Sequence, residues 1–485
     1  MLTREEMLAR MLGSDPTANG QFIVAVRTTG IYCLPTCRPS RKPKPENVIF
    51  YATANEARAA GFRPCKLCKP DDFYAGHHAE ESLIERLAAR IAGDPGAYRS
   101  IGAMAEETGI GTSKLHELVR AHYHTTPAAL LNRARITAAR VALLEGSQQI
   151  AGIAFTVGFE SLSAFNENFR KHTALTPLDY RRLRGQQEFT LALPADYQTA
   201  RILRYLGRDR QSVTERVEGA TYATVLRLTS NQQTDTATLV RVTFAPGAAQ
   251  CQIICPHALD AHALGQVHDQ LLRTLGLTGD PARFEAQIAE TPDLAPLLLG
   301  QQGLRVPLIA DPFNALVWAI TGQQITLAFT YMLRRRLIER VGVPFGEGLH
   351  APPTAAAIAA LEPADLIALG FSRAKADYLS GAARAFVDGR LPLAALAGES
   401  ATQIERALLA VRGIGPWSAH YILMRHFGFL DCVPLGDAGL TAGLQRFFAL
   451  EKRPDKRETL TLMARFSPYR SLATFHLWQY HGTAG

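Results

Sequence analysis

The spacing of apolar side chains divides the chain into four segments. The first holds a short helical lead and a strand-like run, Phe22–Val26, and a continuous helical pattern begins at Glu80. The third alternates in short β-branched runs separated by turns rich in Gly, Pro and Asn, and helical periodicity then returns. We therefore expect a multidomain α+β protein: a small α/β domain at 1–78, an all-α domain at 79–185, an α+β sheet domain at 186–292 and a second all-α domain at 293–485.

Individual elements follow from the same pattern. The strands expected in the third segment are EFTLALP, ATYATVLRL, TATLVRVTFA and QCQIICP, with one amphipathic helix over residues 259–277. Further helices are expected over Pro127–Leu144, Thr354–Leu369 and Arg373–Val387. Cys251 and Cys255 are four residues apart, but they stand in an apolar strand without further ligands, so we assign them to the core.

The composition of the 485 residues is that of an ordinary globular protein, 47% hydrophobic and 20% charged. A net charge of +8 favours a polyanionic partner, nucleic acid first. No apolar run reaches the roughly 18 residues of a membrane span, and the start MLTREEMLAR lacks the apolar core of a secretory signal. We therefore expect a cytoplasmic protein with no membrane partner. Seven Cys is an odd number, which favours metal ligands or reactive thiols over disulfides.

Four of these cysteines form two close pairs. Cys33 and Cys37 are four residues apart, and Cys65 and Cys68 follow in the sequence CKLC. Two such pairs can fold into a tetrahedral thiolate cage, which is the arrangement that structural zinc prefers. On spacing alone, a purely structural zinc ribbon remains open. The surrounding sequence is basic, with Arg27, Arg38, Arg41, Lys42, Lys44, Arg63, Lys66 and Lys69.

The segments TTGIYCLPTCRPS and ENVIFYATANEARAAGFRPCKLCKP resemble the Ada-type methyl-phosphotriester domain over nearly its whole length. The resemblance implies that Cys33 is a zinc ligand and also the nucleophile that takes a methyl group from a methylated DNA phosphate. Cys37, Cys65 and Cys68 would complete the zinc site. Methylation would remove about one negative charge and so strengthen DNA binding. Two further positions match the family's phosphate contacts: Thr29 and Arg63.

Two helix-turn-helix units are predicted in the second segment. Ala105 and Gly109, and again Ala154 and Gly158, stand four residues apart at inner-helix and turn positions. One such pair is common in helical hairpins of any kind. The tandem, which ends in GFESLSAFNENFRKHTALTPLDYRR, resembles the AraC-type DNA-binding domain that usually follows the methyl-phosphotriester domain in Ada proteins.

The second recognition helix of this tandem would be seated by Phe165 and Phe169, which are one helical turn apart. The residues expected to contact DNA are Ser161, Ser163, Asn166, Arg170 and Lys171. Arg181, Arg182 and Arg184 are read either as further phosphate contacts or as a solvated helix face.

A Gly-x-Gly turn, Gly413–Gly415, lies between two apolar segments with the pattern of helices. Without Cβ atoms the backbone there can turn tightly and approach another surface, and the amides that open the helix from Trp417 suit a phosphate. Asp437 follows in the loop PLGD as an isolated carboxylate that the apolar pattern does not explain. By itself such a turn is weak evidence. Together, a phosphate-binding hairpin and one carboxylate suggest an enzyme that works on DNA.

The whole stretch VRGIGPWSAHYILMRHFGFLDCVPLGDAGL resembles the helix-hairpin-helix DNA glycosylases, most closely the AlkA type, and the sheet segment resembles the domain that precedes their catalytic part. The resemblance implies Asp437 as the catalytic residue and Gly413 and Gly415 as DNA contacts. It also implies a hairpin that commonly holds a monovalent cation. The residues that it places in an aromatic base pocket are Tyr421 and Trp478, and Trp417, beside the hairpin, is also expected to bind the substrate.

Two positions refine this resemblance. The family's wedge, which fills the gap left by a flipped base, corresponds to Gln324 in ITGQQIT, where AlkA-type enzymes carry an apolar residue. Trp417 stands where members that also cut the DNA backbone carry a Lys for a Schiff base. Trp cannot form one, so a monofunctional glycosylase is expected. Asp431 is a second nearby carboxylate, whose family counterpart is not assigned to catalysis.

The resemblances together predict a fused alkylation-response protein. It would sense methyl phosphotriesters through one four-cysteine Zn²⁺ site, activate promoters, and hydrolyse the N-glycosidic bond of alkylated bases such as 3-methyladenine. Its expected partners are alkylated DNA, promoter DNA and RNA polymerase. A PCHR sequence is absent, so repair of O6-methylguanine is not expected. The alternatives are a transcriptional activator whose C-terminal half only binds DNA, and a repair enzyme whose front half only docks on DNA.

Overall fold

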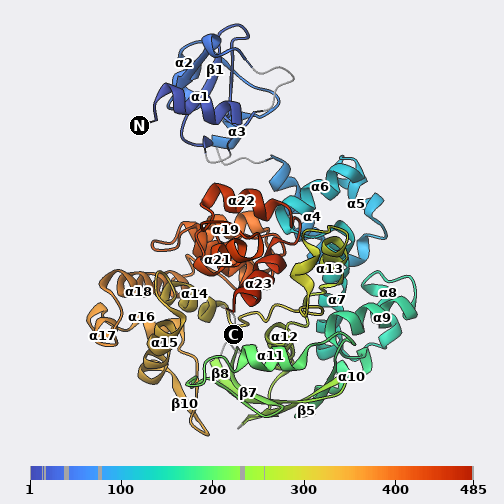
Figure 1. Cartoon of the computed structure of the whole chain (residues 1–485). Coiled ribbons are helices and arrows are strands. Elements are labelled where there is room, and N and C mark those ends of the chain that lie inside the picture. The colour runs from blue at the N-terminus through green and yellow to red at the C-terminus, as the bar shows by residue number, and fades with distance from the viewer. Residues whose placement is uncertain are drawn as a thin grey trace. The chain divides into compact units, whose positions relative to one another are not determined.

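The computed structural model describes residues 2–13, 15, 18–37, 43–74, 79–229, 235–255 and 257–482. The chain forms two compact units, residues 1–86 and 87–485 (Figure 1). The predicted boundary at residue 78 falls within 75–78, outside the described residues. None of the helices in the described ranges combines the length and the apolar composition that crossing a membrane requires.

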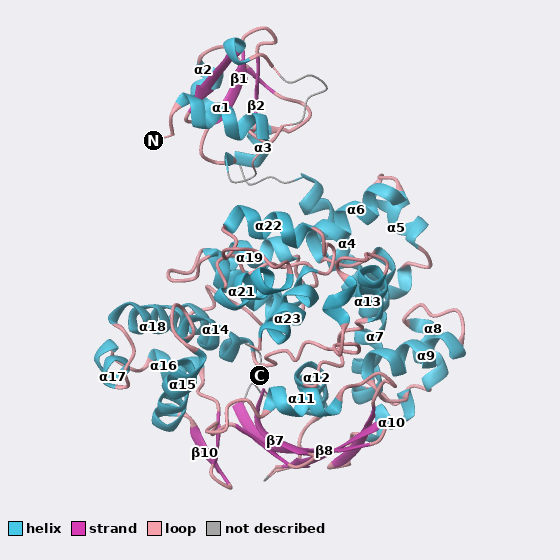
Figure 2. Ribbon diagram, viewed as in Figure 1, coloured by secondary structure: helices cyan, strands magenta, loops and turns pink. Residues whose placement is uncertain are grey.

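The first unit is built on a four-stranded sheet in the order β3-β1-β2-β4 (Figure 2). The predicted strand is confirmed as β1 (Ile23–Val26), which pairs with its neighbours in antiparallel register. Because successive side chains of a strand point to opposite faces, Val24 packs towards the first helix and Ala25 towards the second. The other elements are α1 (Arg4–Gly13), β2 (Ile31–Cys33), β3 (Val48–Tyr51), α2 (Ala54–Ala59), β4 (Arg63–Pro64) and α3 (Pro70–Tyr74).

The predicted helix-turn-helix segment is helical. Gly109 ends one inner helix at φ +68°, and Gly158 ends the other at φ +95°. A Cβ on Gly158 would lie 3.1 Å from the Arg135 guanidinium and from the Gly96 Cα, so this turn requires glycine. Phe165 and Phe169 are fully buried, as predicted. The helices are α4 (Ala79–Gly93), α5 (Ile101–Thr108), α6 (Thr112–Tyr123), α7 (Pro127–Glu145), α8 (Ile150–Thr156), α9 (Leu162–Thr173) and α10 (Pro177–Arg182).

A five-stranded antiparallel sheet follows, in the order β5-β9-β8-β7-β6. Cys251 is buried in it, as predicted. The edge strand β6 was not predicted because its sequence, ERVE, carries charges, which an edge strand can expose to water. Helix α11 was not predicted either. The elements are β5 (Glu188–Ala192), α11 (Thr199–Leu206), β6 (Glu215–Glu218), β7 (Thr221–Thr229), β8 (Asp235–Ala245), β9 (Ala248–Ile254) and α12 (Ala261–Thr274).

The C-terminal part is mostly helical. Helix α18 (Arg373–Val387) confirms one prediction, but the single helix expected over Thr354–Leu369 is wrong. Pro363 begins a separate helix there, because the residue before a proline avoids the helical conformation. The other elements are α13 (Ala282–Ala289), α14 (Pro312–Thr321), α15 (Leu327–Val341), β10 (Val343–Gly346), β11 (Leu349–Ala351), α16 (Ala355–Ala359), α17 (Pro363–Ala368), α19 (Ala401–Leu409), α20 (Pro416–Ile422), α21 (Ala438–Phe447), α22 (Lys456–Ala464) and α23 (Arg470–His481).

Helix α12 joins the sheet to the helix-turn-helix helices. The Arg140 side chain lies 3.2 Å from the Asp269 carboxylate and bonds the Tyr180 hydroxyl at 3.0 Å. The fully buried His268 ring lies 2.7 Å from the carbonyl oxygen of Thr173 and edge-on to Tyr180. These polar contacts join the helix-turn-helix helices to the sheet domain within the compact unit 87–485.

Three buried histidines should make the stability of this unit depend on pH. Burial lowers the pKa of His268 to about 3, of His426 to about 4 and of His476 to about 3. Above about pH 6.5, the ordinary histidine pKa, both folded and unfolded chains leave these rings neutral. Below it only the unfolded chain gains their protons. We expect urea titrations to show the free energy of unfolding falling as the pH is lowered from 6.5 towards 4, by about 1.4 kcal/mol per pH unit for each ring.

His268→Gln keeps a donor for the Thr173 carbonyl but removes one titrating ring. It should reduce the protons taken up on unfolding near pH 5 by about one. An unchanged pH dependence in this variant would contradict the assignment.

Candidate functional site

Asp437 is the residue around which the candidate site is built. It caps the N-terminus of α21, where its Oδ1 accepts from the Leu440 amide at 2.7 Å. The indole Nε1 of Trp478 donates to the same oxygen at 2.9 Å, and the indole Nε1 of Trp417 donates to Oδ2 at 3.0 Å. Three N–H donors therefore fix both the position and the plane of the carboxylate.

The predicted aromatic residues come together beside this carboxylate. The Trp417 and Tyr421 rings of α20 stack with centroids 5.3 Å apart and planes at 24°. Tyr421 lies 6.2 Å from Trp478, which comes from α23. Because each indole donates to Asp437 as well, the two tryptophans hold the carboxylate in addition to forming an aromatic wall, which the sequence did not indicate.

The hairpin glycines differ in what surrounds them. Gly413 has φ +92°, and a Cβ there would lie 2.3 Å from the ring of Tyr378. Gly415 has an extended φ of −97° and nothing within 4 Å of a Cβ position. The fold requires glycine at position 413, because a side chain there would collide with Tyr378. At Gly415 the space beside the backbone is open, so a partner surface can approach it.

Gln324 is exposed at a positive φ of +56°. Its neighbour Gln323, which the sequence did not single out, donates its side-chain amide to the Gly413 carbonyl at 2.8 Å and to the Ser418 hydroxyl at 3.0 Å. The turn that carries Gln324 is therefore tied to the hairpin, although the two are some 90 residues apart in sequence.

Three further side chains near the aromatic wall were missed by the sequence reasoning. The Arg425 guanidinium lies 5.8 Å from the Tyr421 ring and 5.3 Å from the ring of Tyr205, and that of Arg208 lies 3.9 Å from Tyr205. These three side chains line a cavity of about 100 Å³. Burial raises the pKa of Tyr421 to about 12. Tyr205 and Arg208 belong to the sheet segment, far along the chain from the aromatic wall, so no local pattern in the sequence indicates this cluster.

The carboxylate of Asp431 is fully engaged by neighbouring side chains. Its carboxylate is paired with Arg470, whose Nε and Nη2 lie 2.7 and 2.8 Å from the two oxygens, and it accepts from the Ser467 hydroxyl at 3.1 Å. A carboxylate occupied in this way orients the loop before Asp437.

The four predicted cysteines of the first unit also converge. The Sγ atoms of Cys33, Cys37, Cys65 and Cys68 all lie within 4.8 Å of one another. Four sulfurs at about 2.3 Å from one Zn²⁺ ion require comparable separations, so the cluster fits zinc. Hydrogen bonding to Cys37 raises the pKa of the Cys33 thiol, and the same bond lowers the pKa of Cys37 to about 4. Such crowded sulfurs suit a cation that replaces their protons.

The predicted phosphate contacts of this unit are exposed. Thr29 lies in the turn between β1 and β2, and Arg63 is in β4, which pairs with β2. Of the basic residues expected around the cysteines, Arg38, Arg41 and Lys42 lie outside the described residues.

The predicted DNA-contacting residues of the second recognition helix lie on its exposed face. Ser161 caps α9, and Lys171 pairs with Asp280 at 3.2 Å. Arg181 and Arg184 instead bond carbonyl oxygens of Gln148, Leu143 and Gly146. The exposed residues are Ser161, Ser163, Asn166, Arg170 and Lys171.

Four known protein families match successive parts of the chain and together cover most of it. The metal binding domain of Ada matches residues 6–71, and a helix-turn-helix domain matches residues 104–183. The AlkA N-terminal domain matches residues 188–311, and the HhH-GPD superfamily of base excision DNA repair proteins matches residues 317–468. The chain therefore carries, in this order, the domains of an Ada-type regulator and of an AlkA-type DNA glycosylase. The predicted mixed, multidomain architecture is confirmed.

Relatives with the same combination and with single halves are known. A Mycobacterium tuberculosis protein described as a probable bifunctional transcriptional activator/DNA repair enzyme AlkA is 29% identical over 483 residues, which cover 96% of this chain and 94% of that protein. The Escherichia coli bifunctional transcriptional activator/DNA repair enzyme Ada is 34% identical over 37% of this chain and 49% of its own length.

The glycosylase part has its own relatives. The Bacillus subtilis DNA-3-methyladenine glycosylase is 36% identical over 36% of this chain and 59% of its own length. The structure of a 3-methyladenine DNA glycosylase from Archaeoglobus fulgidus shares the fold, with a TM-score of 0.53 at 18% identity over 61% of this chain and 98% of that one.

The two hairpin glycines should respond differently to alanine. Gly413→Ala forces a positive φ on a residue with a side chain and drives its Cβ into Tyr378, so we expect a loss of about 2–3 kcal/mol in the free energy of unfolding. Gly415→Ala should leave stability within about 0.5 kcal/mol, because its Cβ meets nothing. Urea denaturation of both variants measures the difference. Equal losses would show that the turn is not built as described.

Proposed function

We propose that the AlkA-type half removes alkylated bases such as 3-methyladenine by hydrolysing their N-glycosidic bond, with Asp437 as the catalytic residue. The observation that carries the proposal is the fixed carboxylate of Asp437 beside the Trp417–Tyr421–Trp478 wall. An alkylated purine carries positive charge on its ring, so its bond to the sugar is already weak. Aromatic faces attract such a cation.

In this mechanism the damaged nucleotide leaves the duplex before reaction, because its glycosidic carbon is inaccessible inside the stack. As the base departs, positive charge develops on the sugar, and the Asp437 carboxylate stabilises it and orients the attacking water. The three N–H donors hold that carboxylate in place without reorganisation.

In this proposal the hairpin and the turn before α15 bind the distorted DNA. The open side of Gly415 lets a phosphate approach the backbone amides, where a monovalent cation bound by carbonyl groups would assist. Gln324 would fill the space left by the flipped base. Trp417 has no amine, so the product is an abasic site with an intact backbone.

Asp437→Asn tests the catalytic assignment. Asn retains the helix cap but not the negative charge, so the single-turnover release of 3-methyladenine from methylated duplex DNA should fall by about 10²–10³-fold. Asp455→Asn is the matched control, because Asp455 caps α22 in the same way and lies outside the site. Unchanged release by Asp437→Asn would exclude the assignment.

We propose further that Cys33 accepts a methyl group from a DNA methyl phosphotriester. Its sulfur would attack the methyl carbon as the carbon–oxygen bond breaks, leaving a phosphodiester anion and a thioether. Zinc, when bound, keeps the four thiols deprotonated. Thr29 and Arg63 would bind the phosphate, and the site's charge would change from about −2 to −1, which reduces its repulsion of DNA.

Cys33→Ser should abolish methyl transfer from methylated DNA, measured as the mass of the intact protein after incubation. Cys255→Ser, which lies outside the cluster, should transfer the methyl group as the wild type does. Methylation of the Cys33→Ser protein would show that another residue is the acceptor.

The helix-turn-helix domain supports a second function, promoter recognition. The exposed Ser163, Asn166 and Arg170 side chains on one face of α9 are suited to a DNA groove. Methylated protein bound there would activate transcription by contact with RNA polymerase.

A further inference from the structure

Side chains of other elements hold the loop that leads to Asp437, each by accepting a hydrogen bond from one of three consecutive backbone amides of the loop. The Asp431 amide donates to the Nδ1 of His124 at 3.2 Å, the Cys432 amide to the Ser471 hydroxyl at 3.0 Å, and the Val433 amide to the Nδ1 of His420 at 3.1 Å. Ser471 and His420 belong to the glycosylase domain. His124 does not, because it ends α6 in the first helix-turn-helix unit.

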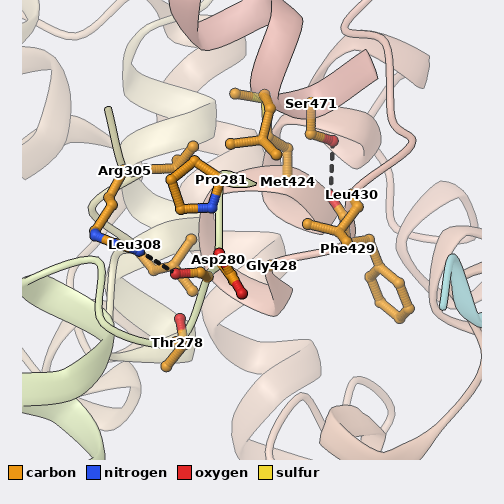
Figure 3. Close-up of a pocket in the computed structure, with 13 residues that line it drawn as sticks. Thr278, Asp280, Pro281, Arg305, Leu308, Met424, Gly428, Phe429, Leu430 and Ser471 are labelled. Atoms are coloured by element: carbon orange, nitrogen blue, oxygen red, sulfur yellow. Dashed lines mark hydrogen bonds between the residues drawn. The ribbon is translucent and has the colours of Figure 1, made fainter. Parts of the chain in front are cut away.

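The His124 contact belongs to a continuous patch. The ring of His124 meets Phe429 edge-on, with centroids 5.4 Å apart, and its Nδ1 lies 3.9 Å from the Sγ of Cys432. Phe429 and Ser471 line a cavity of about 60 Å³. In Figure 3 the Phe429 ring is turned away from the other labelled residues, and the Ser471 hydroxyl donates to the Phe429 carbonyl. Two residues earlier in α6, the Nδ1 of His122 lies 3.0 Å from the Thr402 hydroxyl of α19.

The protonation state of His124 suits this contact. A backbone amide can only donate, so Nδ1 must accept and the ring proton must be on Nε2. Burial lowers the pKa of His124 to about 4, while Asp431 opposes that shift and Arg470 adds to it. Nδ1 is therefore an unprotonated acceptor at neutral pH.

His124 also has a backbone conformation that few side chains adopt. Its φ is +50°, in the left-handed region, where Asn, Asp and His are tolerated best among residues other than Gly. This conformation ends α6 and directs the ring at the loop. Ala174 ends α9 in the same conformation, with φ +55°, so it is the hydrogen bond from the loop amide, and not the backbone, that singles out His124.

We propose that His124 is a positioning residue for base excision: the first helix-turn-helix unit fixes the Asp431 amide and thereby the loop that presents Asp437. The inference rests on the proposed glycosylase function. Asp431 lies only six residues before Asp437, and between them the Asp437 amide bonds the Pro434 carbonyl at 3.1 Å, so a shift at Asp431 passes directly to the carboxylate. Misplacement of a reacting group by about 1 Å costs about 10²-fold in rate.

Three substitutions separate the hydrogen bond from the strain. In His124→Asn the side-chain oxygen lies near the position of Nδ1, and Asn tolerates the positive φ. In His124→Gly the strain disappears together with the acceptor. In His124→Gln the oxygen lies too far along the side chain to reach the Asp431 amide. The control is His122→Ala, which removes the Thr402 contact of the same helix but leaves the loop untouched.

The full-length protein is assayed in two ways. With saturating methylated DNA, His124→Gly and His124→Gln should lower the single-turnover release of 3-methyladenine about 10-fold without changing the DNA concentration for half-saturation. His124→Asn and His122→Ala should stay within about 2-fold of the wild type. Amide hydrogen exchange over residues 428–437 should be faster in the Gly and Gln variants and restored in the Asn variant.

Wild-type release and exchange in His124→Gly would overturn the inference, and so would an Asn variant as impaired as the Gly variant. Asp437→Asn in the same assay keeps the two proposals apart. If wild type and Asp437→Asn release bases equally, the proposed catalytic function fails, while the exchange measurement still decides whether His124 anchors the loop.

Discussion

The arrangement of the glycosylase half depends on one carboxylate and the three N–H groups that hold it. In the role proposed for Asp437, a carboxylate that stabilises a short-lived cation cannot reorient during the reaction, so its donors have to be rigid beforehand. Here they are two indoles and the first turn of a helix, which come from α20, α23 and α21. Packing among these three helices therefore sets the geometry of the site.

The same requirement extends outward through the chain. The Gln323 side chain ties the turn that carries Gln324 to the hairpin, and the loop before Asp437 is anchored at three amides. One anchor comes from a helix of the regulatory part. The contacts of α12 with α7 and α10 join that part to the sheet domain at a second place. The helix-turn-helix helices thus belong to the same compact unit as Asp437 and its donors.

Sequence reasoning succeeded where the chemistry is local or where a motif recurs. The cysteine pairs, the two Ala-x-x-x-Gly units and helix α18 each depend on spacings within one stretch of chain. It failed where a neighbour far along the chain decides, as for Gln323 and for the Arg208 and Arg425 cations beside the aromatic wall. The β6 strand was missed for another reason, its charged sequence. The split of the helix expected over 354–369 had a visible cause in Pro363, which the apolar pattern outweighed.

The histidine at the end of α6 bears on whether the glycosylase half can be separated from the rest of the chain. A glycosylase that stands alone must satisfy the corresponding amide with its own residues or with water. In this chain that amide depends on a side chain of the neighbouring domain, so a deletion of the helix-turn-helix units would also remove one of the three anchors of the loop.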